Sequence, residues 1–474
     1  MHESCGIFGI YSPSEDVARL TFYGLYALQH RGQESAGIAT ADGKIIRIYT
    51  GMGRVSTVFN EDSLKILTGR MAIGHNRYST SGSSRANNAQ PILVSNETST
   101  IAVAHNGNLV NAEHLYQELV GQGYRFTGTT DSEVIAYLIL ASPGKDWVEK
   151  IRHTMRRIKG AYSLVILTPT ELYTVRDPLG VRPLCLGKVD HGWVVASETC
   201  ALDHIGAEFV REVEPDEIVK INENGLQSFR GDSSKNATCI FEYIYFARPD
   251  SLINGKLLYN ARLAMGAGLA REHPIDGDIV MGVPDSATAA GTGYARESGI
   301  PVVEGLIKNR YVGRTFIMPD QRMRDLGVKV KFNPMPQVLD AERVVVVDDS
   351  IVRGTTTPKV VKMLRKAGAK EVHMRICAPP IKHPCFFGVD MATRGELIAA
   401  QKTIPQICEF IGADSLGYLS VKGLLKAVGL PRENFCLACF TGEYPIPVQL
   451  EMDKLGIENM ANRRFDACEA MEDK

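Results

Sequence analysis

The sequence lacks the features that mark membrane, secreted and nucleic-acid-binding proteins. Its 474 residues contain no apolar run long enough to span a bilayer, and the first residues, Met1–Cys5, have neither the basic nor the apolar region of a signal peptide. The formal net charge is −1, so overall electrostatics do not favour a nucleic-acid partner. We therefore expect a cytoplasmic protein with no membrane and no nucleic-acid partner. Its 10 cysteines should be thiols, nucleophiles or metal ligands rather than disulfides.

The length and composition predict more than one folded domain. A chain of 474 residues is too long for one hydrophobic core, and 44% hydrophobic with 23% charged residues is normal for a globular protein. The polar segment 231–236 has the composition of a linker. We expect a first domain that ends near residue 232 and a second domain over 233–450. A charged helical tail is expected over 451–474.

The most specific pattern is the stretch Val344–Thr356. Its four valines predict a strand buried on both faces, as in a parallel sheet, and Asp348 and Asp349 follow where that strand ends. After a hydroxyl-rich loop, Pro358 begins a predicted helix that ends near Gly368. Loop amides and a helix N-terminus favour an anion, and the acids can bind sugar hydroxyls or a metal. The alternative is an ordinary strand-to-helix turn with solvated carboxylates.

This string resembles the motif by which type I phosphoribosyltransferases bind phosphoribosyl pyrophosphate (PRPP). The resemblance implies that Mg²⁺ is held near Ser286, Asp348 and Asp349, although Ser286 could instead be a helix N-cap. The cation-rich segment 307–334 would be a lid over the pyrophosphate, with a solvated or disordered loop as the alternative. The implied PRPP-binding residues are Lys308, Arg310, Asp348, Asp349, Ser350, Arg353, Gly354, Thr355 and Thr356.

Polar, glycine-containing clusters follow one another in the first half, between apolar segments. They lie at residues 28–37, 74–80, 104–109 and 128–133, and they follow the alternating, β-rich string 5–11, in which Cys5 would begin a strand. Binding residues often occupy loops of this kind. Each cluster also has an ordinary explanation. The ordinary readings are a small buried cysteine for Cys5, a surface cation for Arg77, a hairpin turn for Asn106 and Gly107, and a helix N-cap for Asp131.

In this order the clusters resemble the glutaminase domain of class II, N-terminal-nucleophile amidotransferases, which fold as an αββα sandwich. The resemblance implies that Cys5, as the first residue, attacks the glutamine amide and that its α-amino group, with a reference pKa of about 7.7–8.0, is the base. Asn106 and Gly107 would stabilise the oxyanion. Arg77 would bind the α-carboxylate and Asp131 the α-ammonium of the substrate. The implied glutamine-binding residues are Arg31, Gly32, Arg77 and Asp131.

The sequence departs from the simplest form of this family pattern in two places, at residues 1–4 and at four cysteines. Because Cys5 is not residue 2, the mechanism requires removal of residues 1–4, as in relatives with a propeptide. Cys436 and Cys439 form a C-x-x-C pair, which by itself is redox-active, zinc-binding or fortuitous, and no thioredoxin-like context surrounds it. The wide spacing resembles the iron–sulfur subset of these enzymes. It implies a 4Fe–4S cluster, with zinc as the alternative, on Cys239, Cys385, Cys436 and Cys439.

The remaining cysteines and two further motifs have structural interpretations. We expect Cys185 and Cys200 to be structural. We expect the segments 176–183 and 196–198, which also match the glutaminase family, to form packing and interface contacts. No partner is evident by spacing for Cys377, Cys408 and Cys468, which should be inert.

Taken together, the two halves resemble the glutamine PRPP amidotransferases. The resemblance implies an α/β and α+β chain, with the αββα sandwich followed by a parallel phosphoribosyltransferase sheet. Ammonia made from glutamine at Cys5 would react with PRPP, through a passage closed when PRPP orders the lid, to give 5-phosphoribosylamine, glutamate and pyrophosphate. This is the first committed step of de novo purine nucleotide (IMP) synthesis. A homotetramer inhibited by purine nucleotides is implied as well.

Two other functions fit the sequence less well. Glucosamine-phosphate and asparagine synthetases share the glutaminase pattern but not an acid pair and phosphate loop after a valine strand, and no Ser-Gly-Gly loop for ATP is present. A non-catalytic PRPP or nucleotide sensor would not need Cys5, Arg77 and Asp131 together.

Overall fold

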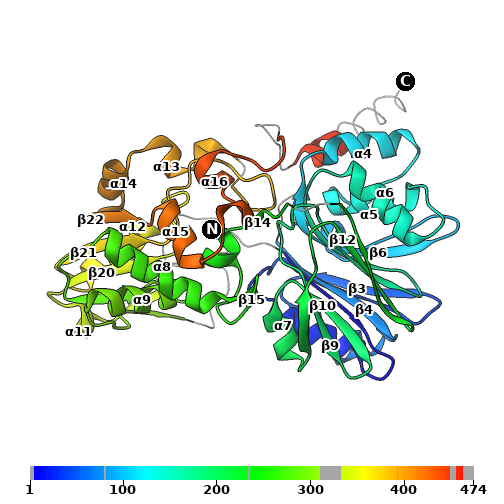
Figure 1. Ribbon diagram of the computed structural model, residues 1–474, viewed down its shortest axis with the longest axis horizontal. Coiled ribbons are helices and arrows are strands. Elements are labelled where there is room, and N and C mark those ends of the chain that lie inside the picture. The colour runs from blue at the N-terminus through cyan, green and yellow to red at the C-terminus, as the bar shows by residue number, and fades with distance from the viewer. Residues whose placement is uncertain are drawn as a thin grey trace.

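The computed structural model describes residues 5–78, 82–232, 235–309, 332–391, 393–448 and 455–462. Two bodies lie side by side (Figure 1). One is built on antiparallel sheets from strands between Gly6 and Arg230, and the other on a parallel sheet from strands between Ile279 and Tyr418. Within the described part of the chain, no helix combines the length and the apolar character needed to cross a membrane.

The first body contains two facing antiparallel sheets. The strands of one are β1 (Gly6–Tyr11), β2 (Ser35–Ala41), β3 (Ile46–Met52), β4 (Met71–Arg77), β9 (Cys185–Val189), β10 (Gly192–Ala196) and β11 (Glu208–Glu212), in the order β11-β9-β10-β1-β4-β2-β3. The strands of the other are β5 (Ile92–Ser95), β6 (Thr100–Leu109), β7 (Gly160–Leu167), β8 (Leu172–Arg176), β12 (Glu217–Asn222) and β13 (Gly225–Arg230), in the order β13-β12-β8-β7-β6-β5.

Helices cover the outer faces of both sheets. The helices α1 (Val17–Ala27), α2 (Val55–Val58), α3 (Glu61–Lys65) and α7 (Thr199–His204) share a buried core with the first sheet. The helices α4 (Ala112–Gly121), α5 (Asp131–Ala141) and α6 (Trp147–Arg157) share one with the second. A third apolar cluster lies between the sheets and includes Ile7, Ile73, Ala104 and Val165. These layers form the expected αββα sandwich.

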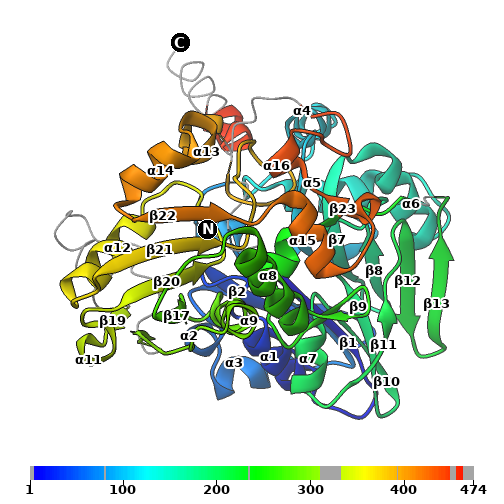
Figure 2. The same cartoon turned by 60° about the vertical axis from the view of Figure 1, so that its left-hand side comes forward.

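The second body is a parallel sheet between helices (Figure 2). Its strands β17 (Ile279–Gly282), β20 (Arg343–Asp348), β21 (Glu371–Ile376) and β22 (Ser415–Tyr418) are adjacent in that order. The helices α8 (Leu258–Glu272), α9 (Thr288–Ser298) and α15 (Val421–Val428) pack in one apolar cluster. The helices α12 (Thr357–Lys366) and α14 (Ile404–Ile411) pack in another. Val344 to Val347 are all 0% exposed, which confirms a strand buried on both faces.

The helix after the phosphate-type loop also ends where the sequence indicates. Its last residue is Lys366, and Gly368 has a φ of +105°, a conformation that glycine adopts without strain. Shorter elements complete the body: β14 (Thr238–Cys239), β15 (Leu252–Ile253), β16 (Lys256–Leu257), β18 (Leu306–Lys308), β19 (Phe332–Pro334), α11 (Pro336–Leu339), α13 (Ile398–Gln401), β23 (Phe435–Cys436) and α16 (Ala438–Thr441).

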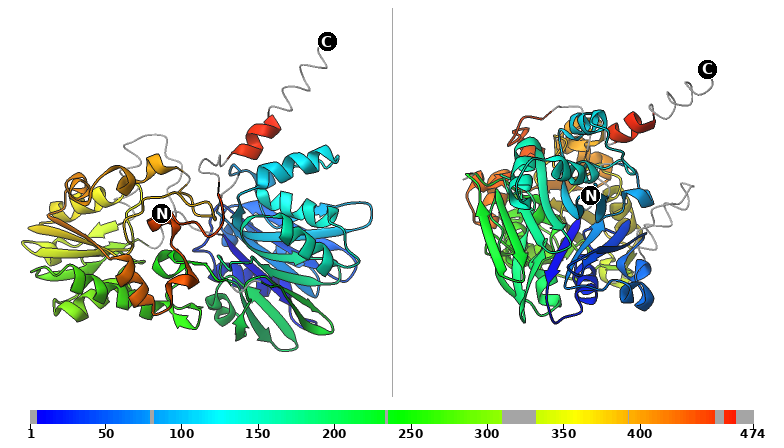
Figure 3. Two further views of the ribbon diagram at one scale, coloured as in Figure 1. Left: turned by 45° about the horizontal axis from the view of Figure 1, so that its top comes forward. Right: turned by 90° about the vertical axis from the view of Figure 1, so that its right-hand side faces the viewer.

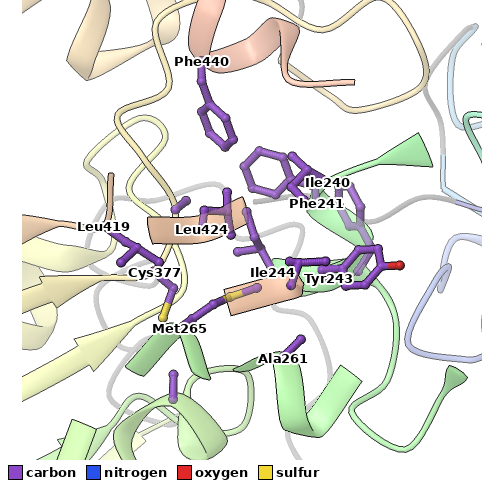
Figure 4. Close-up of a cluster of buried hydrophobic side chains, with 14 of the residues drawn as sticks. Ile240, Phe241, Tyr243, Ile244, Ala261, Met265, Cys377, Leu419, Leu424 and Phe440 are labelled. Carbon is purple, nitrogen blue, oxygen red and sulfur yellow. The ribbon is translucent and has the colours of Figure 1, made fainter. Parts of the chain in front are cut away.

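The segment after the predicted linker anchors the second core. A π-helical turn spans Glu242–Phe246, and the residues around it point into a buried apolar cluster (Figure 4). There Phe241 contacts Phe440 with ring centroids 5.6 Å apart. The chain therefore enters the second body as part of its core, not as a flexible tether.

The end of the described chain returns to the first body. Residues 456–462 are helical and lie beside α4 (Figure 3). Ile457 is 4% exposed and belongs to the core beneath α4 and α5. The expected helical tail is therefore packed, at least over these residues.

Candidate active sites

Cys5 lies directly before β1, a strand near the middle of its sheet, and is 5% exposed. Its Sγ donates to the carbonyl oxygen of Tyr78 at 3.3 Å and accepts from the Tyr78 N–H at 3.5 Å. Burial raises the pKa of the Cys5 thiol, while the Tyr78 backbone and the charge of Arg77 act to lower it. Because the net shift is upward, the thiol needs a base before it can act as a nucleophile.

Asn106 and Gly107 lie within β6, so the hairpin-turn alternative is wrong. Asn106 is 0% exposed, and in the described part of the chain neither its Nδ2 nor its Oδ1 has a hydrogen-bond partner. A buried amide left unpaired is costly, which favours a ligand as its partner. Gly107 has a φ of +155°, and a Cβ there would lie 1.9 Å from the Ala161 carbonyl oxygen. Only glycine fits, and its backbone lines the same cavity as Cys5.

Arg77 and Asp131 line this cavity from different elements. Arg77 ends β4 and is 2% exposed, so it is not a surface cation. Asp131 is the first residue of α5 and is 3% exposed, while Thr130 is the N-cap. Asp131 Oδ2 accepts from the Leu109 N–H at 3.0 Å. A cavity with a buried cation and a buried carboxylate beside a thiol matches the two charged ends of an α-amino acid.

Three further residues of this cavity had no role in the sequence interpretation. Gln90 Oε1 accepts from the His105 N–H at 2.8 Å, and its Nε2 donates to Ser132 Oγ at 2.9 Å. Burial lowers the pKa of His105, so its ring is neutral. His105 and Ser132 lie within recognised clusters, whereas Gln90 belongs to no motif and could be found only from the folded contacts.

Arg31 lies behind Cys5, not in the cavity. Its Nε–H donates to the Cys5 carbonyl oxygen at 3.0 Å, and its guanidinium pairs with Glu198 at 2.5 Å and Glu242 at 2.9 Å. We expected a direct glutamine contact. That role stays a prediction, and these bonds show that the guanidinium holds the nucleophile's backbone against the second body. Gly32 packs on the Arg77 backbone, where a Cβ would lie 2.6 Å from the Arg77 carbonyl carbon.

The acids of the second body converge at the carboxyl ends of two adjacent parallel strands. β17 pairs with β20, which brings Ser286 beside Asp349, and Ser286 Oγ donates to Asp349 Oδ2 at 2.7 Å. Ser350 also donates to Asp349. The N-cap of α9 is Ala287, so the N-cap alternative for Ser286 is wrong. Asp349 is 8% exposed, so it is not a solvated turn carboxylate.

Some of the other residues predicted to bind PRPP lie in the described part of the chain. Lys308 ends β18 and pairs with Asp285 at 2.6 Å. Gly354 has a φ of +69° in the loop before α12, where Thr356 is the N-cap. Arg310 lies outside the described residues, as does most of the segment expected to be a lid.

The four predicted cluster cysteines are neighbours. Parallel pairing of β14 with β23 places Cys239 opposite Cys436. Burial raises the pKa of Cys439 well above its ordinary value, and the charges of Cys436, Cys239 and Cys385 raise it further. Among the described residues, no three His, Cys, Asp or Glu side chains converge closely enough to hold a single metal ion. All nine cysteines of the described chain are free.

One loop of the second body contacts the first body beside the Cys5 cavity. Asn108, next to Gly107 on β6, donates from Nδ2 to the Phe386 carbonyl oxygen at 3.0 Å. Arg182 donates to the Phe387 carbonyl oxygen at 2.8 Å and to Glu242 at 3.1 Å. These contacts confirm that the segment 176–183 forms part of the interface.

Comparisons with known proteins agree with this architecture. A family model described as a glutamine amidotransferase domain matches residues 75–204. The amidophosphoribosyltransferase of Synechococcus elongatus is 51% identical over 467 residues, which cover 97% of this chain and 95% of the relative. The solved glutamine PRPP amidotransferase from B. subtilis, complexed with ADP and GMP, matches with a TM-score of 0.90 at 46% identity, over 96% of this chain and 100% of that chain.

A second solved structure, described as the allosteric regulatory enzyme of purine biosynthesis, has a TM-score of 0.89 at 47% identity. It covers 95% of this chain and 97% of that chain. An N-terminal-nucleophile sandwich joined to a phosphoribosyltransferase sheet defines a two-domain glutamine amidotransferase. The chain belongs to the amidophosphoribosyltransferase family, and it is an enzyme that combines the glutamine amidotransferase and pentosyltransferase classes.

Proposed function

We propose that this chain hydrolyses glutamine at Cys5 and transfers the ammonia to PRPP, as the first step of purine nucleotide synthesis. The products are 5-phosphoribosylamine, glutamate and pyrophosphate. The observation that carries the proposal is that one chain holds both a thiol cavity with Arg77 and Asp131 and a strand-end acid site at Asp348 and Asp349. The names of the full-length relatives support the same pairing of activities.

In the first half-reaction the Cys5 thiolate attacks the glutamine amide carbon. Neither histidine near the cavity is suited to be the base that accepts the thiol proton. Burial lowers the pKa of His105 and brings that of His75 to about 3. The α-amino group of Cys5 meets this need once residues 1–4 are removed. Asn106 Nδ2 and the Gly107 N–H donate to the oxyanion, ammonia leaves, and water releases glutamate from the thioester.

In the second half-reaction ammonia attacks the anomeric carbon and pyrophosphate leaves. Asp348 and Asp349 bind the ribose hydroxyls, and the amides of Arg353–Thr356 bind the 5′-phosphate. Bound Mg²⁺ supplies charge neutralisation for the leaving pyrophosphate. The donor set of Ser286, Asp348 and Asp349 fits it, because Mg²⁺ usually takes one or two carboxylates and completes its shell with phosphate oxygens and water. Lys308 and Arg310 complement the pyrophosphate charge once Lys308 leaves Asp285.

For the four cysteines we propose a 4Fe–4S cluster. Burial raises the pKa of all four thiols, and neighbouring cysteines raise those of Cys239, Cys436 and Cys439 further, so as thiolates they need a compensating positive group. A single Zn²⁺ draws four sulfurs to about 2.3 Å from one point, whereas a cubane holds them farther apart. Four thiolates suit either group, and the wide sequence spacing of these cysteines is what favours the cluster. When bound, the cluster ties β14 and the C-terminal region to the domain core.

One preparation tests the cluster and the propeptide together. Protein purified without air should contain about four iron and four sulfide per chain, and intact mass should show loss of residues 1–4. The Cys439→Ser variant should lose the iron, while the Cys408→Ser control should keep it. Zinc in place of iron would reject the cluster, and an intact Met1 in active enzyme would reject the base assignment.

We further propose a cytoplasmic homotetramer that purine nucleotides inhibit. Aromatic residues are exposed on α1 and β3, where Tyr23 is 48%, Tyr26 is 50% and Tyr49 is 37% exposed, which suits burial against another copy. The solved B. subtilis relative is complexed with ADP and GMP. Mass photometry of the wild type and of a Tyr23→Glu, Tyr26→Glu variant tests the assembly. Inhibition by ADP and GMP at varied PRPP tests the regulation.

The central experiment separates the two half-reactions. Cys5→Ser should abolish glutamine-dependent synthesis of 5-phosphoribosylamine but leave synthesis from ammonia and PRPP within about twofold of wild type. Cys408→Ser, a half-buried cysteine in α14, should change neither activity. Retained glutamine-dependent activity in Cys5→Ser would reject the proposed nucleophile.

A further inference from the structure

The C-terminal helix at residues 456–462 inserts a carboxylate into the first domain. Glu458 is 6% exposed, although it belongs to a segment that follows the second domain in sequence. Its neighbours fix the helix there, since Ile457 is buried in the core beneath α4 and Gln117 Nε2 lies 3.5 Å from Met460 Sδ. A Cβ at Gly456 would lie 1.8 Å from Glu113 Oε1, so the helix approaches α4 closely. Figure 3 shows this helix against the first domain.

The carboxylate of Glu458 joins two loops that are distant in sequence. Its Oε2 accepts from the Ser83 N–H at 3.0 Å and from Thr129 Oγ1 at 3.4 Å, and its Oε1 pairs with Arg85 at 3.1 Å. A buried carboxylate is costly unless donors surround it. Here the donors come from the loops 82–88 and 127–130, so Glu458 stabilises one arrangement of the two loops relative to each other.

These loops support the two residues proposed to bind the charged ends of glutamine. The Ser83 carbonyl oxygen accepts from Arg77 Nη1 at 3.2 Å. Thr129 lies two residues before Asp131, which begins α5. Asn88 bridges the loops, since its Nδ2 donates to the Ser83 carbonyl oxygen at 2.8 Å and to Thr129 Oγ1 at 3.0 Å. Glu458 is therefore separated from each substrate-binding residue by a single connecting residue or a short backbone step.

We infer that Glu458 is a positioning residue of the glutamine site, and that the C-terminal helix is a structural part of the glutaminase. By tying Ser83 to Thr129 it sets the separation of Arg77 from Asp131, and hence the fit of the α-carboxylate and α-ammonium of glutamine. Within the described chain, Glu458 bonds to Ser83, Thr129 and Arg85 and not to Cys5, Asn106 or the acids of the second domain. The inference rests on the proposed function, and its specific consequence is weaker recognition of the α-amino-acid end of the substrate.

The test compares Glu458→Ala and Glu458→Gln with the control Arg85→Ala. The Arg85 side chain is 65% exposed and pairs with Glu458 Oε1, whereas Oε2 accepts from both loops. Loss of the Arg85 side chain should therefore change the KM for glutamine less than about twofold. Glu458→Ala should raise that KM roughly 10-fold with kcat nearly unchanged, because the lost fit affects ground state and transition state alike. Glu458→Gln keeps one acceptor oxygen and should give an intermediate rise.

A substrate analogue provides the readout that a purely structural role would not change. Glutaramate, the glutamine analogue without the α-amino group, cannot use Asp131. The preference for glutamine over glutaramate in kcat/KM should therefore fall in Glu458→Ala by about the same factor as KM rises. Ammonia-dependent synthesis from PRPP should remain at the wild-type rate.

Two results would overturn the inference. One is an unchanged KM and preference in both Glu458 variants. The other is an equal loss of glutamine-dependent and ammonia-dependent activity, which would show general destabilisation. Arg77→Ala and Asp131→Ala, measured in parallel, distinguish this from failure of the proposed function. If they leave the KM unchanged, the binding roles themselves are wrong; if they raise it while Glu458→Ala does not, only the role of Glu458 is wrong.

Discussion

The phenolic hydroxyl of Tyr78 donates a hydrogen bond to Asp390 Oδ2 at 3.2 Å, and this bond crosses from the first domain to the second. Through its backbone Tyr78 also holds the Sγ of Cys5. Asp390 Oδ2 lies 3.9 Å from a guanidinium nitrogen of Arg353, in the loop proposed to bind the 5′-phosphate of PRPP. Three consecutive contacts therefore connect the nucleophile with the acceptor site, and movement of the loop at Arg353 can be transmitted to Cys5.

This connection predicts that Tyr78→Phe weakens the coupling of the two activities. The variant keeps the backbone contacts to Cys5 and loses the hydroxyl that bonds to Asp390. A hydrogen bond to a charged group contributes about 1.5–3 kcal/mol, and partial exposure reduces it. We expect PRPP to stimulate glutamine hydrolysis through this connection, and in Tyr78→Phe that stimulation should fall roughly 3- to 10-fold while ammonia-dependent synthesis stays unchanged. Glutamate release measured with and without PRPP checks this.

Tyr444 provides the matched control for this substitution. Its hydroxyl donates to the Pro384 carbonyl oxygen at 2.8 Å, near the same loop but outside the connection between the sites. Tyr444→Phe should leave the stimulation by PRPP unchanged. Full stimulation in Tyr78→Phe would show that the bond to Asp390 does not carry the coupling.

Asn106→Ala should separate catalysis from stability. Loss of an oxyanion donor lowers kcat about 10²- to 10³-fold. Because the Asn106 amide has no partner within the described chain, its removal leaves no protein group newly unpaired. The melting temperature should therefore fall only by the amount that the cavity left by the shorter side chain accounts for. Steady-state glutaminase kinetics and thermal unfolding measure the two quantities.

Asn111→Ala is the complementary control. Asn111 Nδ2 donates to the Arg157 carbonyl oxygen at 3.0 Å, and its Oδ1 accepts from the Lys159 N–H at 2.9 Å. This variant should lose stability and keep kcat. If Asn106→Ala behaved the same way, the oxyanion assignment would be wrong.

Asp349→Asn should remove the acceptor half of the reaction and spare the donor half. The amide has no negative charge for the ribose hydroxyls or for Mg²⁺, so synthesis of 5-phosphoribosylamine from either glutamine or ammonia should fall at least roughly 100-fold. Alkylation of Cys5 by iodoacetamide in the absence of PRPP should proceed at the wild-type rate. Asp276→Asn, an exposed acid paired with Arg343, is the control and should keep both activities. Retained ammonia-dependent synthesis in Asp349→Asn would contradict the assignment.

Much of this architecture could be predicted from local patterns, because the informative residues are close in sequence. The valine run, its two acids and the following helix obey rules of burial, anion binding and capping that act over about 25 residues. The ordered clusters around Cys5, Arg77 and Asn106 were sufficient for the sandwich fold. In each case one segment carries both the secondary-structure signal and the chemistry.

The contacts that local patterns could not predict join segments far apart in sequence. Glu458 bonds to Ser83 across 375 residues, and Arg31 bonds to Glu242 across 211. Nothing in a charged tail indicates which of its acids will be buried, and nothing near Arg31 indicates that its partner lies beyond the linker. Only the packing of the two domains determines these pairs, so local patterns indicate neither the contact of Arg31 with Glu242 nor a role for Glu458.

The pH dependence of stability in the first domain provides a test of the buried histidine at its centre. His75 is 0% exposed, and its Nε2 donates to the His105 carbonyl oxygen at 3.0 Å. Burial lowers the pKa of His75 to about 3, whereas histidine in an unfolded chain titrates near pH 6.5. Because the folded value is the lower one, the stabilisation is complete above about pH 6.5 and is lost as the pH falls from there toward 3.

Below pH 6.5 the unfolded chain takes up a proton that the folded domain excludes, so His75 should lower the free energy of unfolding by up to about 1.4 kcal/mol for each pH unit. His75→Gln keeps a hydrogen-bond donor but cannot titrate, and its stability should therefore decline less steeply between pH 6.5 and 5. Urea titrations followed by tryptophan fluorescence measure this domain, since both tryptophans, Trp147 and Trp193, lie in it. His191→Gln, at an exposed turn, should retain the wild-type slope. Equal slopes for His75→Gln and wild type would show that the His75 ring is charged in the folded domain or that its burial is not maintained.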